Sequence, residues 1–224
     1  MMQKYPHLFE GETVYARFDL AAFVERMKKY GALWDDPPHV KLELEKHPLF
    51  KKLAEDEPEK IKEMNDEFVD VTRWVDGNDP VVQQVVGEIT KNCKTPEEKA
   101  QVILKYCQQF DYIWDKTTSG KEKARFPSAT ILCRGGDCED GVILFCSLCI
   151  AAGIHPKFFY LVIPGRGFHV MAGVPGRSEK FQIGPEKPTK WNGVFPAELT
   201  GYGPQIGYTG PNLNEQCIMH EVQL

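Results

Sequence analysis

The segment GGDC at residues 135–138 places a thiol directly behind two glycines and a carboxylate, just ahead of a long apolar run. Glycines allow a sharp backbone turn, and the apolar run over 142–152 predicts a fully buried helix that begins near Cys138 and ends at Gly153. Free N–H groups and the dipole at the start of a helix stabilise a thiolate, and the same groups can donate hydrogen bonds to an oxyanion. The sequence therefore predicts that Cys138 is a nucleophile.

A candidate base follows 31 residues downstream, where His169 is flanked by apolar neighbours on a predicted strand over 168–174. A cysteine beside a histidine is the smallest unit that attacks an amide or ester carbonyl through a covalent intermediate. Taken singly, Cys138 could be a small structural residue at a helix start, and His169 could be a hydrogen-bonded core residue. Together with the glycine turn and the buried helix, the pair favours catalysis.

Two helices are predicted upstream of the nucleophile from the residues that would start them. Asp79 before Pro80 has the pattern of an N-cap followed by proline at the first helical position. The segment TPEE at 95–98 combines a capping box with two acids near the positive end of a helix. An aromatic stretch over 110–114 comes next, and we expect its Trp114 to be buried core rather than part of a cleft.

Downstream of the nucleophile, three runs have β-strand character, over 157–164, 168–174 and 179–183. Turn residues separate these runs, and the pattern predicts an antiparallel meander. From residue 185 onward the chain is rich in proline and glycine, and we expect an irregular but ordered tail, because it carries aromatic side chains that can be buried. These are Trp191, Phe195, Tyr202 and Tyr208.

The first part of the chain has a different character from the rest. Residues 1–78 are charge-rich with apolar positions at helical spacing, so we expect a helical N-terminal region over 1–78 and a cysteine domain over 79–224 that ends in the tail. The many Lys and Glu residues over 41–66 are typical of a solvated helix face. The alternative for this charged segment is a docking surface for a partner.

Several of these segments resemble the transglutaminase-like superfamily. The resemblance rests on GDCED at 136–140, on the end of the apolar helix at 151–154, and on His169 followed by valine, and it extends over about residues 79–186. It implies a papain-like α+β fold in which the nucleophile helix packs on an antiparallel sheet. It also implies a Cys–His–Asp triad acting on amide bonds, with Cys138 as nucleophile and His169 as general base and acid.

The third member of that triad is where this chain departs from the family pattern. The family usually carries an Asp on the strand after the histidine strand, and Gly184 stands at that position here. We predict Glu186 as the residue that orients His169, with Gln182 or a residue of the tail as alternatives. If no residue takes this role, the loss can reach about 10⁴ in turnover, and an inactive descendant becomes the alternative.

Composition excludes several classes of protein. The 224 residues carry a net charge of −5, without the basic excess of a nucleic-acid binder. The longest nearly apolar run is shorter than the roughly 20 residues that a membrane-spanning helix needs, and no signal peptide is evident. Seven cysteines without a disulfide-like spacing indicate reduced thiols, so we expect a cytoplasmic protein.

A rival hypothesis uses the thiols as metal ligands. Cys133, Cys138, Cys146 and Cys149 lie within 17 positions, and the last two form a CxxC. Zinc sites use four such ligands, but structural zinc pairs usually sit on tight turns rather than inside an apolar helix. We therefore expect no metal site and no redox pair here, and no organic cofactor.

The sequence thus predicts a cysteine-dependent hydrolase, a peptidase or amidase, that forms a thioester on Cys138 with His169 as general base and acid. Its expected partner is a peptide or protein amide substrate, with neither nucleic acid nor membrane involved. Two alternatives remain open: a protein-glutamine acyltransferase, and a catalytically inactive binding module with the same fold.

Overall fold

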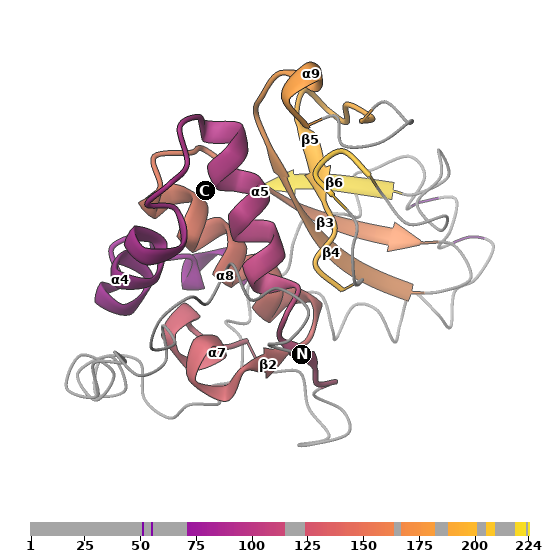
Figure 1. The fold of residues 1–224 in the computed structure, drawn as a ribbon. Coiled ribbons are helices and arrows are strands. Elements are labelled where there is room, and N and C mark those ends of the chain that lie inside the picture. The colour runs from indigo at the N-terminus through magenta and orange to yellow at the C-terminus, as the bar shows by residue number, and fades with distance from the viewer. Residues whose placement is uncertain are drawn as a thin grey trace.

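The computed structural model describes residues 71–114, 124–163, 167–181, 188–200, 205–208 and 218–222, together with Lys51, Glu55 and Leu224. The described chain forms a layer of helices beside an antiparallel sheet (Figure 1). This confirms the predicted α+β class. The helical region expected over 1–78 lies almost entirely outside the described residues.

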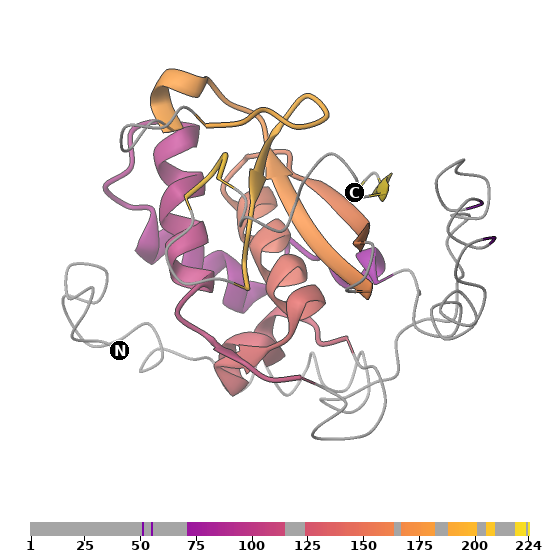
Figure 2. The ribbon, with the colours of Figure 1, turned by 90° about the vertical axis from the view of Figure 1, so that its right-hand side faces the viewer.

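The helical layer is built around one buried helix, α8 (Cys138–Ala151). The other helices are short, and three of them pack against it: α4 (Pro80–Ile89), α5 (Pro96–Cys107) and α7 (Pro127–Cys133). A short 3-10 helix, η5 (Thr72–Trp74), precedes them. On its other side α8 contacts the sheet, so it lies between the helices and the strands (Figure 2). None of the helices in the described ranges is both long and apolar enough to cross a bilayer.

The predicted helix boundaries are confirmed by their caps. The Asp79 carboxylate accepts a hydrogen bond from the Val81 N–H at 2.8 Å at the start of α4. The Thr95 hydroxyl accepts one from the Glu98 N–H at 3.2 Å at the start of α5. Helix α8 ends just before Gly153, whose φ of 78° lies in the left-handed region that glycine adopts without strain.

The sheet has four antiparallel strands in the order β5-β4-β3-β6. The strands are β3 (Lys157–Ile163), β4 (Gly167–Val174), β5 (Phe195–Ala197) and β6 (Ile218–Val222). The long pairing of β3 with β4 sets Leu161 opposite His169. One face of the sheet packs on the helices, and the other face carries a second, smaller apolar cluster formed by Phe159, Leu161, Met171 and Val194.

Two sequence predictions for this region are wrong. The run over 179–183 was expected to be the third strand, but Ser178–Phe181 forms a short helix, α9, and β5 takes the place beside β4. The Phe181 side chain is buried against Phe195, with ring centroids 5.2 Å apart, so the run packs as a helical turn over the edge of the core. The tail is also not irregular throughout, since it supplies both β5 and β6.

A two-stranded parallel ladder leads into Cys138. It joins β1 (Asp111–Tyr112) to β2 (Gly135–Gly136). A Cβ atom on Gly135 would collide with the Ile113 side chain, and one on Gly136 would collide with the Asp140 carboxyl group. Both positions require glycine for this close approach, which explains the two glycines of the GGDC segment.

Candidate active site

The nucleophile candidate Cys138 is the first residue of α8 and is half-buried. The first N–H groups of an α-helix have no partner within the helix, so the backbone at Cys138 is suited to holding an anion. Its thiol donates a hydrogen bond to Oε2 of Glu139, with sulfur and oxygen 3.3 Å apart. The sulfur therefore lies at the positive end of the helix but next to a carboxylate.

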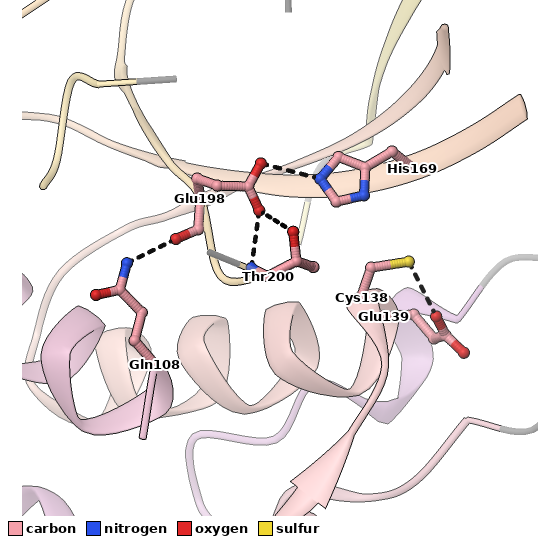
Figure 3. Close-up of polar contacts among 6 residues, drawn as sticks. All are labelled: Gln108, Cys138, Glu139, His169, Glu198 and Thr200. Atoms are coloured by element: carbon pink, nitrogen blue, oxygen red, sulfur yellow. Dashed lines mark hydrogen bonds and ion pairs between the residues drawn. The ribbon is translucent and has the colours of Figure 1, made fainter. Parts of the chain in front are cut away.

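His169 comes from β4, the strand on which α8 packs. Its Nε2 lies 3.1 Å from Oε2 of Glu198, and 15% of its side chain is exposed. The other ring nitrogen, Nδ1, is turned towards the Cys138 sulfur (Figure 3). The packing of helix on sheet thus brings a thiol and an imidazole together from residues that are distant in sequence.

Glu198 follows directly after β5 and is buried. Its Oε1 accepts hydrogen bonds from the Thr200 N–H at 2.8 Å and from the Thr200 hydroxyl at 2.7 Å. Its main-chain carbonyl accepts another from Nε2 of Gln108, at the end of α5, at 2.9 Å. Thr200 therefore holds the carboxylate and Gln108 holds the backbone of Glu198, while the other carboxylate oxygen meets the imidazole, as Figure 3 shows.

The electrostatics of the three groups favour a charged imidazole. Burial alone lowers the pKa of His169, but hydrogen bonds to Cys138 and Glu198, and the negative charge of both, outweigh it and raise that pKa to about 10. Burial raises the pKa of Glu198, and its interactions with His169 and Thr200 outweigh this and bring that pKa below its usual value. The arrangement therefore stabilises an imidazolium held between a carboxylate and the sulfur.

The structure brings Cys138 and His169 together as the sequence analysis expected, while their catalytic roles stay a prediction. Two residues were predicted to orient His169, Glu186 and, as an alternative, Gln182. Both lie outside the described residues. The partner that His169 has in the structure is Glu198, from the tail that the sequence analysis left unassigned. Pro196, two residues before it, obscured the β5 signal, because proline is confined to strand edges and ends.

The acid that follows Cys138 by two positions has a structural partner. Asp140 forms a fully buried ion pair with Nη1 of Arg125, and its Oδ1 accepts a hydrogen bond from the Arg125 N–H at 2.7 Å. Arg125 stands just before α7, so the pair ties the start of α7 to the first turn of α8. This holds the backbone that carries Cys138 in place.

The other thiols are arranged as free residues rather than as ligands. The six described cysteines are free, and those of the CxxC, Cys146 and Cys149, are fully buried inside α8. Burial raises the pKa of both thiols, Cys146 to a value far above the ordinary range. Within the described ranges no group of three or more His, Cys, Asp or Glu side chains could hold a metal ion.

Trp114 does not occupy the buried position that the sequence analysis expected. Half of it is exposed, and Tyr112, two residues earlier, is 54% exposed. The alternation of a strand explains this, because Ile113 between them is the residue turned inward, against Gly135. Two aromatic side chains therefore face outward along the segment that borders β2.

Comparison with known proteins identifies the family of the central segment. Residues 83–183 match the family model of the Transglutaminase-like superfamily. The match confirms the predicted resemblance, and it includes both Cys138 and His169 but ends before Glu198. No curated protein matches the chain.

Solved structures give more distant likenesses. A candidate cysteine protease from Cytophaga hutchinsonii is 18% identical, with a TM-score of 0.38, covering 62% of this chain and 45% of its own. The chain thus spans less than half the length of that protein. Legionella pneumophila LapG, in an EGTA-treated form, is 18% identical with a TM-score of 0.38, covering 72% of this chain and 73% of its own. These likenesses are too remote to inform the chemistry of the site.

Proposed function

We propose that this transglutaminase-like chain is a cysteine-dependent hydrolase of peptide or protein amides. Cys138 is the nucleophile, His169 the general base and acid, and Glu198 the residue that orients His169. The observation that carries the proposal is the 3.1 Å contact between Glu198 and His169, whose other ring nitrogen is turned towards the Cys138 sulfur at the start of a buried helix. Nucleophile, base and orienting group in series are the pattern of covalent acyl transfer.

In the first half-reaction, the Cys138 thiolate attacks the carbonyl carbon of the amide, and a C–S bond forms. The carbonyl oxygen becomes an oxyanion, which accepts hydrogen bonds from N–H groups at the start of α8. The C–N bond then breaks, and the proton of the His169 imidazolium passes to the departing amine. The acyl group remains on Cys138 as a thioester.

In the second half-reaction, neutral His169 removes a proton from water as the oxygen attacks the thioester. The C–S bond breaks, the carboxylic acid leaves, and the proton on His169 restores the thiolate–imidazolium pair. Glu198 stays charged throughout, because its hydrogen bonds to Thr200 and His169 hold its pKa low. An amine in place of water would give acyl transfer, the reaction of a protein-glutamine acyltransferase.

The alternative of an inactive binding module depended on a missing orienting residue, because Gly184 replaces the expected Asp. Glu198 supports the active alternative, since a carboxylate 3.1 Å from Nε2 supplies the same interaction from another part of the chain. Hydrolysis is the reaction we favour over transfer.

The first experiment is alkylation of the native protein with iodoacetamide, followed at each cysteine by peptide mass spectrometry from pH 5 to pH 9. We expect Cys138 to react fast at pH 6, because the imidazolium stabilises its thiolate. His169→Ala is expected to abolish this low-pH reactivity. Cys93, which is also half-buried but lies outside the site, is the internal control.

A panel of peptides carrying a fluorogenic amine then measures turnover, with Cys138→Ala as the inactive variant and Cys93→Ala as the matched control. If Cys138 reacts no faster than Cys93 at pH 6 and no peptide in the panel is cleaved, the proposal of a hydrolase fails and the binding module takes its place.

A further inference from the structure

A pocket lies beside the site, between the end of α5, the β1–β2 ladder and the first turn of α8. Its lining includes Cys107 and Phe110 from the α5 side and Gly136, Asp137 and Gly141 from the α8 side. Leu199 and Thr200 close it from the tail. No step of the proposed mechanism uses this pocket.

The pocket adjoins the reacting groups along the chain at two points. Asp137 immediately precedes Cys138, and Leu199 immediately follows Glu198. A molecule whose carbonyl lies at the Cys138 sulfur would therefore have a neighbouring group within reach of this pocket. The pocket is placed to select substrates rather than to take part in bond breaking.

The walls of the pocket are mostly apolar and are formed by the side chains of Cys107, Phe110 and Leu199. Two of its lining residues, Gly136 and Gly141, have no side chain. A Cβ atom on Gly141 would come within 3.4 Å of Leu199, so the absence of this atom keeps that part of the pocket open. Such walls suit an unbranched aliphatic stem.

The polar groups of the pocket favour a positive charge. Asp137 lines it as a buried residue, and Asp111 and Tyr112 line it as exposed ones, while none of the described lining residues is basic. A carboxylate attracts an ammonium group, and the face of an exposed aromatic ring does so as well.

A further polar group in the lining lacks a partner. Thr130 is 1% exposed, and its hydroxyl oxygen makes no hydrogen bond to any described residue. A buried hydroxyl without a partner is unfavourable. A donor such as an ammonium N–H entering the pocket would satisfy it.

We propose that this pocket binds an alkylammonium group, an aliphatic stem that ends in a positive charge. This chemistry is that of a lysine side chain of the acyl donor, next to the scissile amide. Binding of the alkylammonium group to the pocket does not require catalysis. The role of this binding in substrate selection rests on the proposed function.

The test is a titration of the isotope-labelled full chain with n-pentylammonium, followed by backbone ¹H–¹⁵N NMR. Neutral 1-pentanol and anionic pentanoate serve as matched probes of the same stem. We expect saturable shifts at Gly136, Gly141 and Thr200 with n-pentylammonium, weaker shifts with pentanol and none with pentanoate. Equal or stronger binding of pentanol or pentanoate, or shifts confined to other residues, would overturn the proposal.

Two variants locate the interaction without endangering the fold. Asp111→Asn removes an exposed charge and should weaken n-pentylammonium binding about two- to fivefold, while Glu88→Gln on α4 removes one charge elsewhere and should leave it unchanged. Thr130→Val keeps the shape of a buried side chain whose hydroxyl has no described partner, so it should fold normally. It should weaken n-pentylammonium binding, and ammonium affinities of Asp111→Asn and Thr130→Val equal to that of the Glu88→Gln control would count against the pocket.

Kinetic experiments test whether a lysine of the acyl donor uses the pocket. If the pocket holds a lysine of the donor, fluorogenic peptides with lysine beside the scissile bond should exceed norleucine and glutamate peptides in kcat/KM, and Asp111→Asn should reduce this preference. Peptide turnover without ammonium binding would refute the pocket alone, whereas ammonium binding without turnover or Cys138 reactivity would refute the hydrolase alone.

Discussion

Replacing Glu198 by Gln tests the arrangement of the site most directly. The substitution keeps the size of the side chain and leaves an amide that can still meet Thr200, but it removes the negative charge 3.1 Å from Nε2 of His169. Both side chains are at most 15% exposed, so solvent screens this interaction only weakly. The loss of this negative charge should therefore destabilise the imidazolium of His169 with little reduction by solvent screening.

The magnitude follows from the contact that is lost. A hydrogen bond to a charged group contributes about 1.5–3 kcal/mol, which corresponds to roughly a 10- to 150-fold change in the population of the imidazolium–carboxylate arrangement. Misorientation of the imidazole adds to this, and in the serine-protease triad the equivalent substitution costs about 10⁴ in kcat. We expect kcat/KM on a fluorogenic amide to fall at least tenfold, and up to about 10⁴-fold.

The pH dependence gives a second signature. His169 has a pKa of about 10 in the folded protein against an ordinary 6.5, so its contribution to stability is full below pH 6.5 and is lost as the pH rises towards 10. Glu198 has a pKa below its ordinary 4.5, so its contribution is full above pH 4.5 and is lost as the pH falls through its folded value. The stability deficit of Glu198→Gln should be largest between about pH 4.5 and 6.5.

The assay compares urea unfolding and amide turnover of wild type, Glu198→Gln and Glu221→Gln across pH. Glu221 is the matched control, because it forms a surface ion pair with Lys157 at 2.8 Å on the β6 edge, away from β4. A fall of less than threefold in kcat/KM for Glu198→Gln, or a stability deficit that does not shrink between pH 6.5 and 10, would refute the role assigned to Glu198.

Three further predictions concern neighbouring residues. Asp140→Asn should lower the free energy of unfolding by about 3–5 kcal/mol in urea denaturation, because it leaves Arg125 charged and fully buried; a loss below 1 kcal/mol would contradict this. Glu139→Gln should speed alkylation of Cys138 about tenfold at fixed pH, since two unit charges 3.3 Å apart repel by about 1.3 kcal/mol even at the dielectric constant of water; an unchanged or slower rate would show that the carboxylate does not act on the sulfur. Gly136→Ala should destabilise the protein and slow alkylation of Cys138, because a Cβ atom there collides with the Asp140 side chain; a variant as stable and reactive as wild type in both assays would show that the approach of β2 to α8 is not constrained.

Local signals account for what the sequence predicted correctly. Asp79 and Thr95 each bond to a backbone N–H two or three residues away, so the start of each helix is encoded within one turn. Gly153 ends α8 for an equally local reason, its positive φ. The position of Cys138 at the start of α8 follows from the apolar run behind it and from the two glycines before it.

Tertiary structure alone decided which strands and which acid complete the site. The segments over 179–183 and 195–197 both carry apolar residues at spacings compatible with a strand, and their own residues do not say which one pairs with β4. The outcome depended on packing, because Phe181 is buried against Phe195 while Phe195–Ala197 forms the ladder. A pattern confined to five residues cannot predict which of the two segments takes the position beside β4.

Glu198 shows the same limit at the level of chemistry. It lies 29 residues from His169 along the chain, and its position is fixed by Gln108, which is 90 residues away. The local sequence around Glu198, in a Pro- and Gly-rich tail, does not predict that this acid contacts a histidine. The contact forms only when β5 joins the sheet. The sequence by itself therefore determined the position of Cys138 and its helix and the strand of His169, because these depend on neighbours within a turn or a strand, whereas the acid that contacts His169 depends on contacts that exist only in the folded chain.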